Sequence, residues 1–424
     1  MKKVLIITYY YPPNTGAPAW RPFSWANNFY KENINTTIVT RHWNGNESKW
    51  EDFLKPNHSP ITKTVHENYT LYCLPSKRSK ASIYFSGSNW LSNLLGKPYF
   101  FLSAIFGKLN SEIDGALAFS DFIAEHLKSN QYDAAIITVP PFNMLQLTTL
   151  FQQYKIKLVV DVRDLWNNMA LTNNYHPSLK QKIWDSIYSF HFKRWLKSAD
   201  YVTVITPPFK EVLKNCFKGE MEVVYNGYEN DMFAKIDQPK SEKFIFSIIG
   251  SVYPQQDLSI TMKGLQLFLA DKSPTQVQCR FIGLKIIPEI SDMVKQMLPE
   301  EFVVMSERVS KEEAIRETKM ATVLSYPGWL GVRGIISTKI FDYIASGNVI
   351  LLAPGDKDII DDLLQETNTG ISVFSAEAFA LTLNNWYDKW KNGEAIQAER
   401  KLEQIEFYSR EHQAKILAQI IQSL

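Results

Sequence analysis

Short apolar runs alternate with longer amphipathic stretches along the whole chain. Most of the short runs are apolar on both faces, as parallel strands covered by helices on two sides must be. They predict strands at 3–8, 36–40, 70–74, 134–139, 157–162 and 201–205, and a second series at 222–225, 244–249, 277–282, 302–305, 322–326, 349–353 and 371–374. The stretches between them, such as 22–32 and 177–198, carry apolar residues at helical spacing. This alternation predicts an α/β protein made of doubly wound, Rossmann-like domains.

A break at Thr206-Pro207-Pro208 separates the two series of strands. The chain has 424 residues, which is enough for two domains that each bury a core of their own. We therefore expect an N-terminal domain over residues 1–206 and a C-terminal domain over residues 207–404. Apolar residues recur at helical spacing over about 405–424, which predicts a terminal helix.

The composition is that of a globular protein, with 45% apolar and 21% charged residues. No window approaches roughly 18 unbroken apolar residues, so the sequence predicts no membrane-spanning helix. Cys73, Cys216 and Cys279 are odd in number and far apart, which favours buried, reduced thiols over a disulfide framework. We expect a cytoplasmic protein.

Charge is unevenly distributed, because residues 1–200 hold 22 Lys/Arg against 14 Asp/Glu and the remainder holds 24 against 30. A basic N-terminal half suits an anionic partner such as a membrane surface or a phosphorylated lipid. Residues 83–110 are aromatic and include Lys97 and Lys108, a composition found at membrane interfaces and also in cores or acceptor clefts. We expect peripheral contact with the inner face of the plasma membrane. No nucleic-acid motif accompanies the charge, so nucleic acid is not an expected partner.

The segment from Gly334 to Gly347 predicts a loop followed by a short helix. Ser337 or Thr338 can cap the start of the helix, and Gly347 can end it in the left-handed conformation. The strand that follows indicates that the helix begins at the carboxyl edge of a parallel sheet, where its N–H groups and dipole favour a phosphate. Lys339 adds a positive charge and Asp342 can accept hydrogen bonds from sugar hydroxyls. A phosphate and a ribose are parts of a nucleotide sugar. An ordinary amphipathic helix between two strands is the alternative.

In the N-terminal half, polar residues follow three predicted strands. The first strand leads into a loop containing Gly16, which allows close backbone approach, and Arg21, which supplies planar donors. Pro141 lies just after another strand. The strand 157–162 leads directly into the charges of Asp161, Arg163 and Asp164, which are costly at a strand end unless they are paired or used. A structural Asp–Arg pair is the alternative to a functional site here.

These segments, in this order, resemble family 4 glycosyltransferases, which have the GT-B fold. The N-terminal loop is similar to the Tyr-Pro-Pro…Gly-Gly…Arg start of many members, and residues 161–166 look like an Asp-x-Arg-Asp-x-Trp motif found in polysaccharide-building members. Asp342 fits the second acid of the family's Glu-x7-Glu motif, whereas Gly334 occupies the position of the first. The resemblance implies two Rossmann-like domains facing a cleft, with the terminal helix packing back on the first domain.

The resemblance also implies roles for individual residues. Asp164, Arg163 and Lys339 are the expected catalytic residues, with Asp164 contacting or deprotonating the acceptor hydroxyl, Arg163 orienting it and Lys339 stabilising the leaving group. Arg21, Asp161 and Pro141 are expected on the acceptor side. The expected donor site consists of Gly16, Gly250, Ser251, Arg308, Val309, Ser337, Thr338, Lys339 and Asp342.

Several of these donor roles compensate for charges that this chain lacks. Family members follow the glycine at position 250 with an arginine and a lysine, where this chain has Ser251 and Gln255-Gln256. Arg308, Arg333 and Lys339 are the expected replacements. Arg308 is also expected to stack on the base, with Val309 backbone atoms reading its edge.

No cofactor and no metal are expected. Asp356-Lys357-Asp358 predicts a helix cap rather than a metal site, and the seven histidines have no metal-ligand spacing. The resemblance implies a retaining transfer of a sugar from a nucleotide-sugar donor to a glycan or a polyprenyl- or other lipid-linked acceptor, in the assembly of a bacterial-type surface polysaccharide such as lipopolysaccharide or capsule. The alternatives are a sugar-nucleotide epimerase or hydrolase of the same fold, or a catalytically degenerate assembly partner.

Overall fold

The computed structural model describes residues 1–45, 55–76, 90–107, 115–166, 171, 176–238, 241–253, 255–285, 287–329, 331–396 and 399–424. These residues form two compact units, each built on one sheet. The first unit contains the described residues within 1–170, 174–225 and 413–424. The second contains Leu171 and those within 226–412.

The first unit has an eight-stranded sheet in the order β3-β4-β2-β1-β5-β6-β7-β8. All neighbouring strands are parallel except β3, which runs antiparallel to β4 at the edge. The strands are β1 (Lys2–Ile7), β2 (Ile34–Arg41), β3 (Thr62–Val65), β4 (Tyr69–Leu74), β5 (Ala134–Val139), β6 (Lys157–Val162), β7 (Tyr201–Val204) and β8 (Glu220–Val223).

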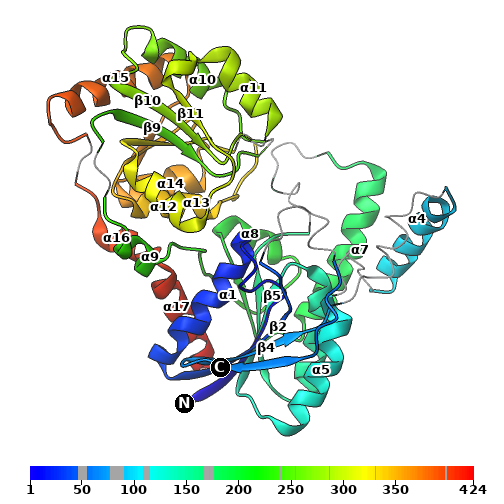
Figure 1. The fold of residues 1–424 in the computed structure, drawn as a ribbon. Helices are drawn as coiled ribbons and strands as arrows, with labels where there is room; N and C mark the ends of the chain where they lie inside the picture. Colours follow the sequence, from blue (N-terminus) through cyan, green and yellow to red (C-terminus); the bar gives the residue numbers. More distant parts are fainter. Residues whose placement is uncertain are drawn as a thin grey trace. The chain divides into compact units, whose positions relative to one another are not determined.

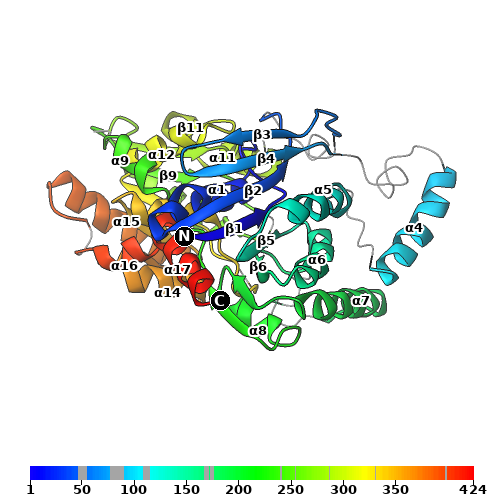
Figure 2. The same cartoon turned by 90° about the horizontal axis from the view of Figure 1, so that it is seen from below.

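Helices cover both faces of this sheet (Figure 1). On one face, α1 (Ala17–Asn28) and the later part of α17 (Arg410–Ser423) share a core with alternate residues of β1, β2 and β5. The same helices lie together in Figure 2. The other helices of the unit are α4 (Trp90–Ile105), α5 (Gly115–Ser129), α6 (Thr148–Gln153), α7 (Leu179–Leu196) and α8 (Pro207–Leu213), with short 3-10 turns at Phe29–Glu32 and Phe142–Leu147.

The second unit has a six-stranded, entirely parallel sheet in the order β11-β10-β9-β12-β13-β14. The strands are β9 (Phe244–Ile249), β10 (Val277–Ile282), β11 (Val303–Met305), β12 (Val323–Tyr326), β13 (Val349–Leu352) and β14 (Gly370–Ser372). Its helices are α9 (Asn230–Lys235), α10 (Ser259–Leu269), α11 (Pro288–Met297), α12 (Lys311–Met320), α13 (Thr338–Ala345), α14 (Ile359–Thr367), α15 (Ala376–Lys391) and α16 (Leu402–Phe407), with a 3-10 turn at Glu300–Phe302.

One face of the second sheet packs against α10, α11 and α15 in a large apolar core. Close packing of α10 on α15 requires a glycine, because a Cβ on Gly264 would lie 2.4 Å from the Phe379 ring. Helices α12, α13 and α14 lie on the other face (Figure 1). Helix α13 follows β12 in this parallel sheet, so its first turn lies at the carboxyl edge.

The structure divides the chain later than the sequence predicted. Residues 207–225 lie in the first unit, because β8 pairs with β7 rather than with a strand of the second sheet. Pro207 and Pro208 do not mark a linker, since they occupy the first turn of α8, where proline is well tolerated. The predicted terminal helix is two helices, α16 and α17, and residues of α17 from Ala414 onward pack in the core of the first unit.

Among the described helices, none combines the length and the apolar character needed to cross a bilayer. Of the aromatic stretch 83–110, residues 83–89 and 108–110 lie outside the described residues.

Candidate functional site

In the second unit, the loops after β9 and β10 approach each other closely through glycine. Gly250 and Gly283 both have positive φ angles, of 83° and 85°. A Cβ on Gly283 would lie 3.6 Å from the Gly250 Cα atom. The Gly250 N–H group donates to the Ile282 carbonyl at 2.9 Å, so this donor is engaged within the protein.

The start of α13 is fixed at this edge of the sheet by two tyrosines. The Tyr343 hydroxyl accepts a hydrogen bond from the Ile249 N–H at 2.8 Å and donates to the Ile249 carbonyl at 3.2 Å. The Tyr326 hydroxyl lies 2.9 Å from Ser337 Oγ. Ser337 holds the cap position, as predicted, although its side chain makes no capping hydrogen bond. The first turn of α13, with Thr338 and Lys339, is thereby placed beside the ends of β9 and β12, where its backbone dipole favours an anion.

Lys339 is a half-buried cation whose ammonium group contacts no carboxylate in the described part of the chain. Its Nζ atom donates to the Ser251 carbonyl at 2.7 Å and lies 5.1 Å from the centre of the Tyr326 ring. Burial lowers the pKa of this ammonium group to about 7. An anion bound beside Lys339 would restore the charged form, because an opposite charge favours protonation.

Asp342 lies one turn further along α13 and is paired within the unit. Its carboxylate accepts a hydrogen bond from the ammonium group of Lys311, at the start of α12, and the two side chains are 14% and 28% exposed. Lys311 was not among the residues predicted from the sequence. A signal was present, because a lysine at the first position of a helix opposes the helix dipole and needs a compensating acid.

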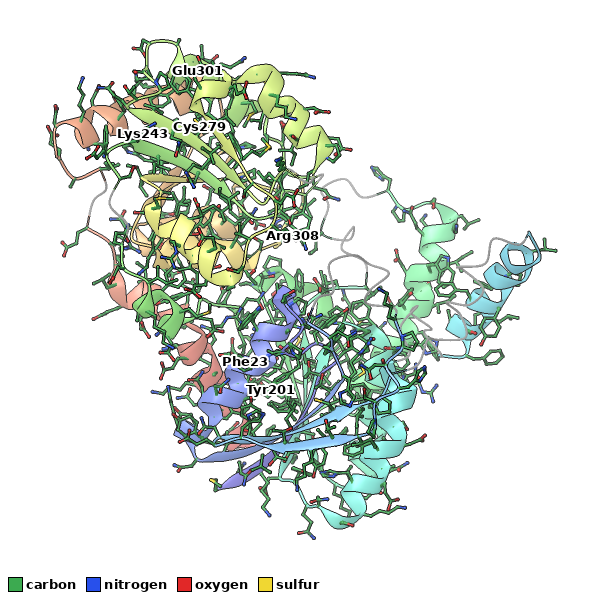
Figure 3. The ribbon with its side chains drawn as sticks, in the orientation of Figure 1. Phe23, Tyr201, Lys243, Cys279, Glu301 and Arg308 are labelled. Carbon is green, nitrogen blue, oxygen red and sulfur yellow. The ribbon has the colours of Figure 1, made fainter. Side chains whose placement is uncertain are left out.

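Three other residues expected to contact the donor, Arg308, Val309 and Arg333, are exposed. Arg308, labelled in Figure 3, and Val309 lie in the loop between β11 and α12. Arg333 is 66% exposed, and its Nε atom lies 3.9 Å from an Asp358 carboxylate oxygen. The second oxygen of that carboxylate accepts a hydrogen bond from the N–H group of Gly334. The acid beside position 334 is therefore Asp358, which comes from the start of α14.

Asp356 performs the capping role that the sequence predicted for the Asp356-Lys357-Asp358 segment. Its carboxylate accepts hydrogen bonds from the N–H groups of Asp358, Ile360 and Asp361, at 3.1 to 3.2 Å. Burial raises the pKa of Asp356 to about 6. The described residues contain no cluster of three or more potential metal ligands.

An aromatic pair at the same edge of the sheet was not predicted from the sequence. The rings of Tyr253 and Trp329 lie 5.3 Å apart on the loops after β9 and β12, and Tyr253 is 47% exposed. Gln256 joins the two loops, because its amide donates to the Pro327 carbonyl at 2.6 Å and accepts from the Tyr253 N–H at 3.1 Å. Aromatic residues directly after two neighbouring strands were the available signal.

In the first unit, Arg21 and Asp161 form a buried ion pair rather than an accessible site. Two guanidinium nitrogens of Arg21 donate to the two carboxylate oxygens at 3.1 and 2.7 Å, and the side chains are 2% and 0% exposed. Thr138 and Thr203 hydroxyls donate to the same carboxylate at 3.0 and 2.8 Å. The predicted acceptor role of this pair does not fit, because no surface of either side chain is available to a ligand. The structural Asp–Arg pair left open by the sequence is present, but its arginine is Arg21.

Arg163 and Asp164 follow β6 at its carboxyl end. Arg163 is buried, donates to the Pro140 carbonyl at 2.8 Å and lies 5.9 Å from the Tyr10 ring, and burial lowers its pKa. Asp164 reaches the surface, yet the surrounding protein atoms desolvate its carboxyl group and raise its pKa, while Arg163 acts in the opposite direction. Asp164 is therefore the accessible titratable group of this motif.

Pro141 and Gly16 are the two other residues of the first unit that were predicted to contact substrates, and both are engaged in local backbone structure. Pro141 is buried at the start of the 3-10 turn after β5. Gly16 precedes α1 with an ordinary φ of −66°, and its N–H group donates to the Asn14 side chain at 3.0 Å. A Cβ there would lie 2.9 Å from that Asn14 oxygen, so a larger residue would have to displace the Asn14 side chain.

The chain is similar over its full length to solved two-domain glycosyltransferase structures. They include sucrose-phosphate synthase from Thermosynechococcus elongatus, with a TM-score of 0.65 at 13% identity, covering 100% of this chain and 99% of that chain. The E. coli trehalose-6-phosphate structure bound with UDP-2-fluoro glucose has a TM-score of 0.62 at 10% identity, with 100% and 99% covered. The α,α-trehalose-phosphate synthase (UDP-forming) from Burkholderia xenovorans in complex with glucose-6-phosphate has a TM-score of 0.62 at 10% identity, with 100% of both chains covered.

No protein-family model matches the sequence, and no curated protein matches it at a significant level. The structural similarity and the two parallel sheets confirm the predicted fold class, which is α/β with two Rossmann-like domains of the GT-B type.

Proposed function

We propose that the protein is a retaining glycosyltransferase, similar to family 4, that moves a sugar from a nucleotide-sugar donor to an acceptor hydroxyl. The observation that carries the proposal is the start of α13, where a half-buried lysine without a carboxylate partner in the described chain lies beside a helix N-terminus. A diphosphate leaving group gains negative charge as its bond to the sugar breaks. A fixed cation and fixed backbone dipoles stabilise that charge better than water does, because they need no reorganisation.

The donor is proposed to be a nucleoside diphosphate sugar with its diphosphate at Lys339 and the first turn of α13. One structurally similar protein is bound with UDP-2-fluoro glucose, which supports a UDP-sugar as the first donor to test. We propose that Arg308 contacts the base and that Asp342, with Lys311, contacts the ribose.

The acceptor is proposed to be a glycan or a lipid-linked sugar of a bacterial-type surface polysaccharide, bound by the first unit. Asp164 is the proposed proton acceptor for the acceptor hydroxyl, because it combines accessibility with a raised pKa. Arg163 is the proposed positioning residue beneath it. The glucose-6-phosphate complex of one similar structure adds sugar phosphates to the acceptors worth testing.

A thermal-shift screen against UDP-, GDP-, dTDP- and CMP-sugars tests the donor proposal, because a ligand that binds only the native state raises the apparent stability. The stabilising donor is then incubated with glycan, lipid-linked and sugar-phosphate acceptors, and products are identified by mass spectrometry. A glycosylated acceptor supports transfer. An epimerised nucleotide sugar, or free nucleotide with no glycosylated product, would instead indicate an epimerase or hydrolase. A protein that no nucleotide sugar stabilises would fit an assembly partner.

Asp342→Ala is expected to raise the donor KM more than it lowers kcat. The carboxylate is proposed to hold the ribose, which is bound equally in the ground and transition states, so its loss weakens uniform binding. Lys311→Met is the matched variant, because it removes the other half of the ion pair and leaves the carboxylate in place. If both variants change Tm equally and neither changes KM, the pair is structural and the ribose contact is wrong.

Asp164 is expected to set the acidic limb of the pH–rate profile. Its carboxylate must be ionised to accept a proton, and desolvation raises its pKa above the ordinary value. The value of kcat should therefore fall as the pH decreases through that raised pKa. The Asp164→Asn variant should have a lower kcat and a pH–rate profile from which this acidic limb is absent. An asparagine variant with unchanged kcat and an unchanged acidic limb would exclude Asp164 as the base.

A further inference from the structure

Helix α7 carries an apolar stripe on its outer face, where a soluble helix is normally polar. Leu179, Ile183 and Phe190 are 76%, 43% and 63% exposed, and Ser186 is exposed between them. Positions 179, 183, 186 and 190 share one helical face. The opposite face holds the buried residues of the helix, including Phe192, Trp195 and Leu196. The stripe is therefore not the side by which α7 packs on the first unit.

Helix α4 repeats the same arrangement. Leu94, Phe101 and Ile105 are 61%, 37% and 42% exposed, and Pro98 is exposed between them. Positions 94, 98, 101 and 105 have the same spacing as the stripe of α7, whereas Ser103 and Ala104 are buried.

The two helices are in contact. The Trp184 ring of α7 lies 5.3 Å from the Phe100 ring and 5.6 Å from the Phe101 ring of α4. Phe101 belongs to the stripe of α4, whereas Trp184 lies about 100° around α7 from Ile183, so this contact joins the two helices beside the stripe of α7. The two stripes therefore lie on helices that pack together, and we call the two stripes together the α4–α7 surface.

Exposed cations border the stripe of α7 on both sides. At helical spacing, Lys182 and Lys193 lie on one side of the stripe, and Lys180 and Arg194 lie on the other, all of them exposed. Asp185 is the only acid in the sequence of α7, and α4 contains none. An apolar stripe bordered by cations is the pattern of a helix that lies in the plane of a membrane interface, with its apolar side chains among the acyl chains and its cations at the headgroups.

We propose that the α4–α7 surface docks the protein on an anionic lipid bilayer. The charge favours this occupant over a second copy of the chain, because two such surfaces facing each other would bring their cations together. It assigns the peripheral membrane contact expected from the sequence to a defined surface, and it does not depend on glycosyl transfer.

Vesicle flotation with the full-length protein tests this surface. The protein is expected to float with phosphatidylglycerol-containing vesicles and not with pure phosphatidylcholine vesicles, and to be released by salt, since surface charge attraction is screened. The double variant Ile183→Ser/Phe190→Ser is expected to lower the partition coefficient about tenfold or more, from the lost apolar burial. Lys182→Gln/Lys193→Gln should reduce the dependence on phosphatidylglycerol.

Leu381→Ser is the matched control, because Leu381 is 64% exposed on α15 of the second unit, outside the α4–α7 surface. This variant should bind vesicles like the wild type. Wild-type protein that does not float with anionic vesicles, or an Ile183→Ser/Phe190→Ser variant that floats equally well, would overturn the proposal. Analytical ultracentrifugation adds a further outcome: a wild-type dimer that this variant dissociates would assign the surface to a second copy. The assay needs no donor or acceptor, so its failure leaves the proposed transfer reaction untouched.

Discussion

Lys339→Met is expected to lower kcat about 10²- to 10³-fold, the usual effect of removing one preorganised group that stabilises developing charge. Methionine keeps most of the apolar stem that packs near Gly250 and the Tyr326 ring, and removes only the ammonium group. The fold should persist, because the buried ammonium group pays a desolvation cost that methionine does not. Steady-state kinetics with the donor found in the thermal-shift screen measure the effect.

Lys285→Ala is the control for this experiment, since Lys285 is exposed on the loop after β10. Its backbone N–H, which the substitution keeps, donates to the Ser306 carbonyl at 3.0 Å. It should retain near-wild-type turnover. A Lys339→Met variant that also keeps wild-type turnover would reject the assignment of the diphosphate to α13.

The low pKa of Lys339 gives the same prediction a dependence on pH. Its folded pKa of about 7 lies below the value near 10.4 expected for an unfolded lysine. Between these values the unfolded state binds more protons, so this residue makes the free energy of unfolding increase as the pH rises through that window. A bound diphosphate favours the charged lysine, so donor binding above pH 7 should take up a proton and weaken as the pH rises. Calorimetry in buffers of different ionisation enthalpy measures the uptake, which Lys339→Met should abolish.

The strands of both sheets could be predicted where they are apolar on both faces, because burial between two helical layers leaves a continuous apolar run. The strand β3 gave no such signal, since all four of its residues are exposed at the sheet edge. The strand β8 was predicted with the wrong sheet, because Pro207-Pro208 resembles a linker in sequence while it begins a helix in the structure. A local pattern identifies a strand but does not determine its neighbour.

The sequence also predicted which residues lie near the strand ends better than it predicted their partners. Lys339 and Ser337 lie at the start of α13 as expected, because capping and helix periodicity are local properties. Asp342 and Lys311 are 31 positions apart, and Arg21 and Asp161 are 140 positions apart. Nothing local distinguishes a carboxylate that receives a ligand from one that is neutralised by a distant cation.

The Arg21–Asp161 pair leads to the largest stability effect that we expect. Arg21→Met should lower the free energy of unfolding of the first unit by about 3–5 kcal/mol, because it leaves the Asp161 carboxylate buried without a compensating charge. The two threonine hydroxyls that remain cannot replace a guanidinium group. The two units can unfold separately, so urea unfolding should be followed together with hydrogen exchange of β6 by mass spectrometry.

Lys157→Met provides the control, because Lys157 lies on the same strand as Asp161 but forms an ion pair with Asp200 in which the two side chains are 49% and 31% exposed. Its loss should cost about 1 kcal/mol or less. The double variant Arg21→Met/Asp161→Leu should recover part of the stability lost in Arg21→Met, since no buried charge remains. A single Arg21→Met variant as stable as the wild type would show that the carboxylate is solvated, contrary to its complete burial.

Arg21 also donates to the Tyr225 carbonyl at 2.8 Å, and the Tyr225 N–H donates to Gln413 of α17 at 2.7 Å. The ion pair is thus linked to residues 225 and 413 of the first unit, so its removal should speed hydrogen exchange there as well as in β6.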